Sequence, residues 1–299
     1  MRYPFYTCDV FTDTRFGGNP LAVLPNATGL TIEQMQLIAR EFNFSESTFV
    51  FPAEQGHTRK VRIFTRQQEL PFAGHPNIGA AFVLASSGAL DDIGTETQIT
   101  FEEKAGLVPI TIRKVAGNQM WCELKAPEPL FLGKMQSVER MATILSLAPG
   151  DIESSTHLPQ QASVGLPFVI TELKTRLALE KAAVNLGALR DLAADGIRPS
   201  LYVYTRSNDA FDIRGRMFAP LGGTIEDPAT GSANYALAGL LTHYHAASDG
   251  HLSWRIAQGV EMKRPSILDA RTQKQGGTVT GVWMAGNCVM VSEGQIEVG

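Results

Sequence analysis

Two stretches of the chain repeat one pattern, and this repeat constrains the fold more than any other feature of the sequence. Residues 68–84 read QELPFAGHPNIGAAFVL, and residues 225–241 read IEDPATGSANYALAGLL. Six of the seventeen aligned positions agree, at an offset of 157 residues (226 − 69). The matched pairs are Glu69 and Glu226, Pro71 and Pro228, Gly74 and Gly231, Asn77 and Asn234, Ala81 and Ala238, and Leu84 and Leu241. Solenoid repeats recur at roughly 20–50 residues, so an offset of this length indicates a duplicated domain.

Further segments repeat in the same order upstream of these two stretches. VRIFT precedes the first copy and GRMFA precedes the second, which aligns Arg62 with Arg216. Still earlier, GNPLAVL and GLPFVIT share a glycine, a proline and an apolar run. Each half is therefore expected to contain a strand, a helix, two strands, a turn, a buried helix and more strands. We predict domains at 1–127 and 128–299, joined at the proline-containing segment KAPEPLFLG, with a C-terminal segment that could pack on the first domain.

Composition excludes several classes of function. The chain has 299 residues, which fits two domains, and 44% of them are hydrophobic, which is sufficient for a sizeable core. The net charge of −4 gives no electrostatic reason to expect nucleic acid or an anionic membrane as a partner. The start MRYPFYTCDVFTD has no secretory-signal pattern, and no apolar run approaches the roughly 18–20 residues of a membrane helix. Three scattered cysteines argue against a disulfide framework or a structural zinc site, so we expect a soluble, cytoplasmic protein.

The hydrophobic pattern distinguishes two kinds of helix. Thr31 and Gln34 have the spacing of a capping box, and the apolar residues that follow them form one stripe of an amphipathic helix. Residues 78–84 and 235–241 are instead apolar on all sides, which is typical of a helix enclosed by its own domain. The segments ESTFVFP, KVRIFT, LVPITIRKV, SLYVYT and DGHLSWRIAQG have the β-branched and aromatic content of strands. We therefore predict an α+β fold of two similar domains, each with a curled sheet around a central buried helix.

The polar residues of both repeats lie just ahead of a buried helix. The first backbone N–H groups of a helix lack intrahelical partners and bind carboxylate or phosphate readily. Gly74 and Gly231 would let a ligand approach the backbone closely. Two such turns facing one another would suit a small carboxylated substrate. Ordinary helix capping is the alternative explanation for Asp227, Thr230 and Ser232.

Glu46 is the candidate acid or base of the first half. It lies in FNFSESTFVF, at a predicted junction between a helix and a strand. If Phe42, Phe44 and Phe49 surround the carboxylate, partial desolvation would raise its pKa toward a value useful for proton transfer. The alternative is that Glu46 only turns the chain at a solvated corner.

Five segments, in this order, closely resemble the phenazine-biosynthesis PhzF-like family: FGGNPLAV, NFSESTFVF, ELPFAGHPNIGAA, GRMFAP and EDPATGSA. The resemblance extends from near the N-terminus to beyond residue 240. It implies a diaminopimelate-epimerase-like fold, with the active site between two similar, mostly antiparallel domains. It also implies a homodimer, and it places Glu46 at the position of the family's general acid/base. His75, Asp227 and Ser232 match its other catalytic positions, and Gly74, Asn77, Thr230 and Gly231 fall in the substrate-binding turns.

By this resemblance, we expect an isomerase that moves a proton between carbons of a small carboxylated, cyclic metabolite without a metal or an organic cofactor. The namesake reaction is the isomerisation of trans-2,3-dihydro-3-hydroxyanthranilate. Epimerases of this fold use a thiol in each turn, whereas this chain has His75 and Ser232 there, so a two-thiol racemase is not expected. An epimerase of another amino or hydroxy acid and a non-catalytic binding protein are the alternatives. His243, His245 and His251 do not have the spacing of metal ligands, so no metal is expected.

Overall fold

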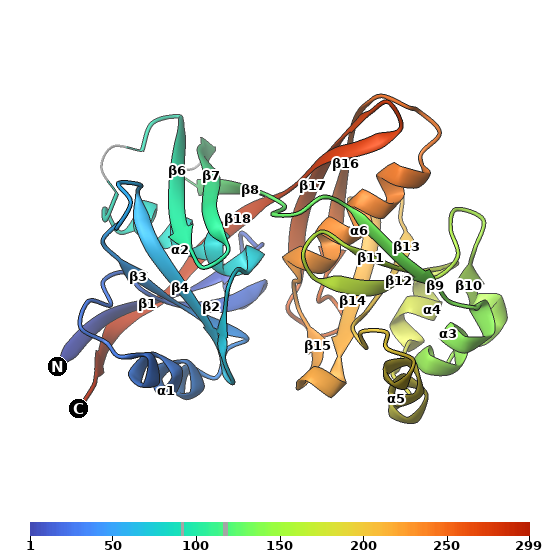
Figure 1. The fold of residues 1–299 in the computed structure, drawn as a ribbon, viewed down its shortest axis with the longest axis horizontal. Coiled ribbons are helices and arrows are strands. Elements are labelled where there is room, and N and C mark those ends of the chain that lie inside the picture. Colours follow the sequence, from blue (N-terminus) through green and yellow to red (C-terminus); the bar gives the residue numbers. More distant parts are fainter. Residues whose placement is uncertain (91–92, 116–118) are drawn as a thin grey trace. The chain divides into compact units, whose positions relative to one another are not determined.

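The computed structural model describes residues 1–90, 93–115 and 119–299 (Figure 1). They form two compact units. Unit 1 contains Met1–Lys125 and Ala285–Gly299, and unit 2 contains Ala126–Met284. Whether these units correspond to the domains expected at 1–127 and 128–299 stays a prediction.

Unit 1 is a curled sheet with one helix inside it and one outside it. Its strands are β1 (Arg2–Val10), β2 (Asn19–Leu24), β3 (Glu46–Phe51), β4 (Arg59–Thr65), β5 (Glu69–Leu70), β6 (Glu96–Glu103), β7 (Gly106–Val115) and β8 (Gln119–Lys125). Its helices are α1 (Ile32–Phe42) and α2 (Gly74–Ser86). Strand β18 (Thr278–Glu297) begins in unit 2, and its last residues pair antiparallel with β1 in unit 1.

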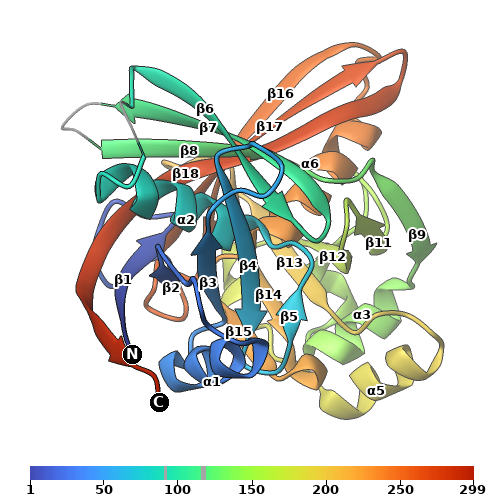
Figure 2. The same ribbon diagram turned by 60° about the vertical axis from the view of Figure 1, so that its left-hand side comes forward.

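The two helices of unit 1 confirm the distinction that the sequence predicts. In α1 the capping box is present, since the Gln34 N–H donates to Thr31 Oγ1 at 3.2 Å and the Thr31 N–H donates to Gln34 Oε1 at 2.9 Å. Its apolar stripe packs against β3 and β4 (Figure 2). Helix α2 is buried from Gly74 to Ala85 and packs against β1, β2, β3, β7 and β8. Gly79 permits this packing, because a Cβ atom there would lie 2.5 Å from Leu21 and 2.8 Å from Val10.

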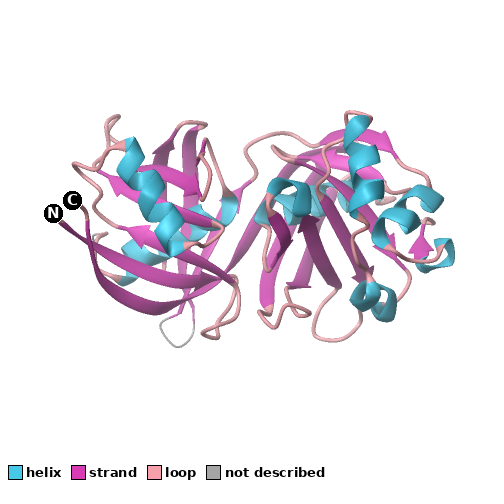
Figure 3. Ribbon diagram, turned by 90° about the horizontal axis from the view of Figure 1, so that it is seen from below, coloured by secondary structure: helices cyan, strands magenta, loops and turns pink. Residues whose placement is uncertain are grey.

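Unit 2 has the same plan with additional helices. Its strands are β9 (Phe131–Met135), β10 (Ile152–Glu153), β11 (Gln160–Ser163), β12 (Pro167–Leu173), β13 (Leu201–Arg206), β14 (Ile213–Ala219), β15 (Thr224–Asp227), β16 (Gly250–Gln258), β17 (Ser266–Gln275) and the first part of β18. Its helices are α3 (Val138–Leu145), α4 (Arg176–Lys181), α5 (Leu186–Ala194) and α6 (Gly231–Tyr244). Helix α6 is enclosed by β11, β12, β16 and β17. Helices α3, α4 and α5 share one apolar core with strands β12–β14 and gather on one side of the unit (Figure 3).

The order and direction of the strands repeat between the units. A parallel pair, β2 with β3 or β12 with β13, is followed by an antiparallel strand, β4 or β14. That strand pairs in parallel with β6 or β16, which pairs antiparallel with β7 or β17. The fold is therefore α+β with two pseudo-symmetric halves, as the repeat predicts. Among the described residues, no helix is both long and apolar enough to span a membrane.

Candidate active site

The turn before each buried helix, α2 or α6, is held by an ion pair of low exposure that recurs in both halves of the chain. Arg62 forms a bidentate ion pair with Glu69, in which two guanidinium nitrogens donate to the two carboxylate oxygens at 2.7 and 2.8 Å. Arg216 does the same with Glu226, at 2.8 and 2.9 Å, and also donates to the carbonyl oxygens of Leu179 and Ala182. Their guanidinium groups fix the turns, because bidentate pairing orients both partners.

Glu46 is the first residue of β3, directly after the turn that ends α1. Asn43 ends that helix in the left-handed conformation (φ 55°), and the chain then enters the sheet with Glu46 beside Leu21 of β2 and Thr65 of β4. The Glu46 side chain is 18% exposed.

The expected place of Phe49 beside Glu46 is wrong. Successive side chains of a strand point to opposite faces, so Glu46 and Phe49 do not share a face. Phe49 lies in a core with Met35 of α1 and Phe64 of β4. Phe42 and Phe44 stack on one another, with ring centroids 6.1 Å apart. The sequence alone gave no strand register, and without the register the neighbours of Glu46 could not be assigned.

His75 contacts Glu46 within unit 1. Its Nδ1 atom lies 3.6 Å from Glu46 Oε2, which is a close contact but longer than a hydrogen bond. Burial lowers the pKa of His75 to about 3, so the ring is neutral at physiological pH. Its Nε2 atom is buried and has no hydrogen-bond partner among the described residues. The pair therefore combines a carboxylate with a neutral imidazole that retains hydrogen-bonding capacity.

The N-terminal end of α2, which begins in the turn around His75, has no side chain that compensates its positive partial charge. No side chain caps the helix at Ala73, and the first turn carries no acidic residue. Gly74, the first helical residue, does not have a positive φ, so the lack of a side chain is what distinguishes it there. Asn77 donates to the Ala73 carbonyl oxygen at 3.1 Å, and its Oδ1 atom has no partner among the described residues.

Asp227 and Thr230 are joined in the corresponding turn of unit 2. The Thr230 hydroxyl donates to Asp227 Oδ2 in a short hydrogen bond, and both residues are buried. Thr230 is the N-cap of α6, yet its side chain makes no capping hydrogen bond. The capping explanation is therefore wrong for Thr230, because its hydroxyl serves Asp227 instead. Gly231 and Ser232 form the first turn of α6, where Gly231 is buried and Ser232 is half-buried.

Two residues that the sequence analysis did not select lie at these turns. Gln258, the last residue of β16, is fully buried and hydrogen-bonds the Asp227 carbonyl oxygen and the Thr230 N–H. Glu103, the last residue of β6, lies next to Asn77, and burial raises its pKa to about 8. Extending the alignment of the two halves past the buried helices would have drawn attention to both strand ends.

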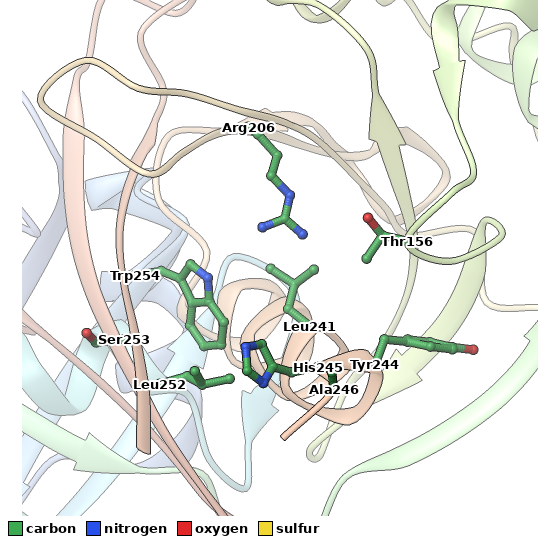
Figure 4. A pocket seen from close by; sticks show the side chains of 9 residues that line it. All are labelled: Thr156, Arg206, Leu241, Tyr244, His245, Ala246, Leu252, Ser253 and Trp254. Carbon is green, nitrogen blue, oxygen red and sulfur yellow. The ribbon is translucent and has the colours of Figure 1, made fainter. Parts of the chain in front are cut away.

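A cavity of about 450 Å³ lies elsewhere in unit 2, at the C-terminal end of α6 (Figure 4). Arg206, Tyr244 and Trp254 line it, together with the other residues labelled in Figure 4. Arg206 already pairs with Glu172 at 3.1 Å. None of the predicted site residues lines this cavity. In the described part of the chain, no three His, Cys, Asp or Glu residues are grouped as metal ligands.

Known proteins that resemble this chain match it over nearly its whole length. The model of a family described as phenazine biosynthesis-like protein matches residues 8–294. An uncharacterized isomerase of Mesorhizobium japonicum is 36% identical, with 97% of each chain covered. The trans-2,3-dihydro-3-hydroxyanthranilate isomerase of Pseudomonas aeruginosa is 34% identical, with 97% of this chain and 98% of the relative covered. A PhzF-family protein from Bacillus anthracis has the same fold, with a TM-score of 0.90 at 24% identity and complete coverage of both chains.

Proposed function

The chain belongs to the phenazine biosynthesis-like protein family and is an isomerase, and we propose that it moves a proton between two carbons of a small carboxylated, cyclic metabolite. The observation that carries this proposal is the contact between Glu46 and the neutral ring of His75 in the turn before α2.

Glu46 is the proposed general base and acid. Its carboxylate removes a proton from one carbon of the substrate and becomes a carboxylic acid, while the electron pair of the broken C–H bond enters the conjugated system. The carboxylic acid exchanges its proton with solvent and then delivers a proton to a different carbon, which restores the carboxylate. A single carboxylate is sufficient for both steps, so the mechanism calls for no metal or organic cofactor.

His75 is proposed to hydrogen-bond the substrate as charge develops. A neutral imidazole can donate from one nitrogen and accept at the other, and the Nε2 atom of His75 has no competing partner among the described residues. The buried position strengthens such a hydrogen bond, because the surroundings are poorly polarisable.

The turn residues are proposed to bind the polar groups of the substrate. The first N–H groups of α2 and α6 are suited to a carboxylate, since neither helix has a side-chain cap or an acidic first turn. We assign Gly74, Asn77, Thr230 and Gly231 to this binding, and Asp227 and Ser232 to contacts with the reacting part of the substrate. Asp227 is positioned for this by the hydroxyl of Thr230.

Hydrogen exchange with solvent tests the proposal. The enzyme is incubated in D2O with trans-2,3-dihydro-3-hydroxyanthranilate, which the Pseudomonas aeruginosa relative is named for, and with a panel of cyclic carboxylic acids. We expect deuterium in the recovered substrate or product, and a loss of at least about 100-fold in Glu46→Gln, in line with general acid/base catalysis. The matched control is Glu41→Gln, an exposed glutamate at the end of α1. Equal exchange in Glu46→Gln and in the native chain would show that Glu46 is not the base.

The position of the deuterium separates the two enzyme classes. Label on a different carbon from the one that lost its proton indicates the proposed isomerase. Label on the same carbon with inverted configuration indicates an epimerase of an amino or hydroxy acid. We also propose a homodimer, as the resemblance implies, and the mass of the particle in solution measures this independently of the reaction.

A further inference from the structure

Glu103 and Gln258 occupy the same position in the two halves of the fold. In unit 2, Gly215 of β14 pairs with Gln258 at the end of β16. In unit 1, Lys60 of β4 pairs with Glu102, so the next residue along each strand brings Val61 beside Glu103. Val61 and Gly215 are themselves aligned as the first residues of VRIFT and GRMFA. The equivalence therefore follows from the strand register and from the sequence.

Gln258 holds the turn of unit 2 through four hydrogen bonds. Its Oε1 atom accepts from the Thr230 N–H at 3.2 Å and from Asn234 Nδ2 at 2.7 Å. Its Nε2 group donates to the Asp227 carbonyl oxygen at 2.8 Å and to Thr230 Oγ1 at 3.1 Å. The remaining amide oxygen, Asn234 Oδ1, accepts from the Tyr202 hydroxyl at 2.6 Å. A neutral amide suits this place, because it must both donate and accept.

The corresponding groups of unit 1 lack such partners. Thr48 stands where unit 2 has Tyr202, because each faces the same aligned position of the next strand, Ile63 or Met217. Thr48 Oγ1, Asn77 Oδ1 and both carboxyl oxygens of Glu103 are buried without a well-aligned hydrogen-bond partner among the described residues. A carboxylate could only accept here, whereas a carboxylic acid, like an amide, has one donor and one acceptor.

The charges around Glu103 do not neutralise it. Glu103 lines a cavity of about 290 Å³ in unit 1, together with the charged residues Lys60, Arg62, Lys104, Glu54 and Glu102. Lys60 pairs with Glu54, Arg62 and Lys104 both pair with Glu69, and Glu102 accepts from the backbone N–H groups of Glu54, Gln55 and His57. On α2, His75 is neutral because burial lowers its pKa to about 3, and Asn77 is uncharged. Each positive charge near Glu103 is therefore already used by another carboxylate.

We propose that Glu103 is a positioning residue that holds the turn before α2 as a neutral carboxylic acid, in the role that Gln258 has before α6. Its carboxyl oxygen accepts from the Asn77 amide, and its O–H donates toward the carbonyl oxygens of the turn. This role rests on the proposed function, because Gly74, His75 and Asn77 are the residues assigned to the substrate. Ionisation of Glu103 removes the donor and loosens the turn that carries them.

The pH dependence of this arrangement follows from the raised pKa of the Glu103 carboxyl group. Burial raises the pKa of Glu103 to about 8, so at pH 7 roughly ten molecules are protonated for each one ionised. The folded chain binds this proton more tightly than the unfolded chain, whose pKa for the group lies near 4.5. The stabilisation is therefore complete below about pH 4.5 and is lost as the pH rises through about 8.

Infrared spectroscopy tests the protonation without any substrate. The difference between the native chain and Glu103→Gln at pH 6.5 is expected to contain the C=O band of a protonated carboxylic acid, replaced by carboxylate bands with a midpoint near pH 8. A carboxylate signal already present at pH 6.5 would overturn the proposal. If Glu103→Gln does not fold, the carboxyl carbons of the native chain, labelled with 13C-glutamate, are titrated by NMR, and the absence of a glutamate titrating near pH 8 has the same consequence.

Amide hydrogen exchange tests the positioning. In Glu103→Leu we expect the amides of 77–79, the first of α2 that intrahelical hydrogen bonds protect, to exchange at least ten times faster, while those of 234–236 are unchanged. In Glu103→Gln protection returns and no longer falls between pH 7 and 9. Gln258→Glu is the matched control, since it should make the α6 turn sensitive to pH in the same sense. Native protection at 77–79 in Glu103→Leu would overturn the role. These readouts need no turnover, so they remain decisive if the deuterium incorporation assay fails.

Discussion

An arginine and a glutamate recur in both turns, and in unit 2 they form an ion pair of low exposure. Arg216 and Glu226 are both nearly buried, and Arg216 also satisfies backbone carbonyl oxygens near the end of α4. Arg216→Met should lower the free energy of unfolding by about 3–5 kcal/mol, because Glu226 is left buried and unpaired. Urea unfolding followed by circular dichroism measures this.

Arg214→Met, two residues earlier on the same strand, is the matched control for that measurement. Arg214 pairs with Asp209, which is 41% exposed, so its replacement should cost no more than about 1 kcal/mol. Equal losses in the two variants would contradict the distinction between the buried and the exposed pair.

Individual residues of the site could be predicted from the sequence only where they lie in a recognisable motif. Glu46 and His75 are brought into contact, and so are Asp227 and Thr230. Glu103 was not predictable, because its chemistry depends on burial at a strand end and not on neighbouring residues in the sequence. Phe49 was wrongly expected beside Glu46 for a similar reason, since strand register decides which side chains share a face.

At the scale of elements, the two halves reach the same packing with different side chains. In unit 2, Tyr202 fills the space over Gly215, where a Cβ atom would lie 2.2 Å from the tyrosine hydroxyl. In unit 1, the smaller Thr48 is accompanied by the larger Val61. In unit 2 the larger side chain, Tyr202, lies on β13 and the glycine on β14. In unit 1 the smaller side chain, Thr48, lies on the equivalent strand β3 and the larger Val61 on β4.

A double-mutant cycle measures this exchange. Gly215→Val alone should lower the free energy of unfolding by about 1–3 kcal/mol through overpacking. Tyr202→Thr alone should lower it by about 3–5 kcal/mol, since it removes an aromatic ring and the donor to Asn234 Oδ1. The double variant should be more stable than the sum of the single losses predicts, by about 1–3 kcal/mol.

Gly222→Val controls for the added valine, because a Cβ atom at Gly222 meets no atom within 4 Å. Strict additivity in the cycle would show that the two positions do not compensate one another.

The sequence alone predicted the elements themselves well, since the capping box of α1 and the uniform burial of α2 and α6 are local patterns. It did not predict which residues pack across strands, because that information is distributed over segments far apart in the chain.

On the scale of the whole molecule, the last residues complete the sheet that begins with the first ones. Residues from Arg2 to Val10 pair with residues from Glu297 to Cys288 in antiparallel register. The helices and short strands could be recognised from periodicity, but this pairing could not, because the two segments are separated by nearly the full length of the chain. The stability of unit 1 therefore depends on a segment that is distant in sequence from the rest of the unit.

Removing residues 285–299 should consequently unfold unit 1, and the cysteines provide the measurement. All three cysteines lie in unit 1, buried and reduced. Burial raises the pKa of Cys122 to about 12 and also raises that of Cys8, so we expect neither thiol to react in the native chain. In the truncated chain, β1 loses its partner strand, and we expect a thiol reagent to modify Cys8 and Cys122 as fast as it does in urea. Cys288→Ser, which keeps the strand, should leave both protected, and continued protection in the truncated chain would show that unit 1 folds without its C-terminal strand.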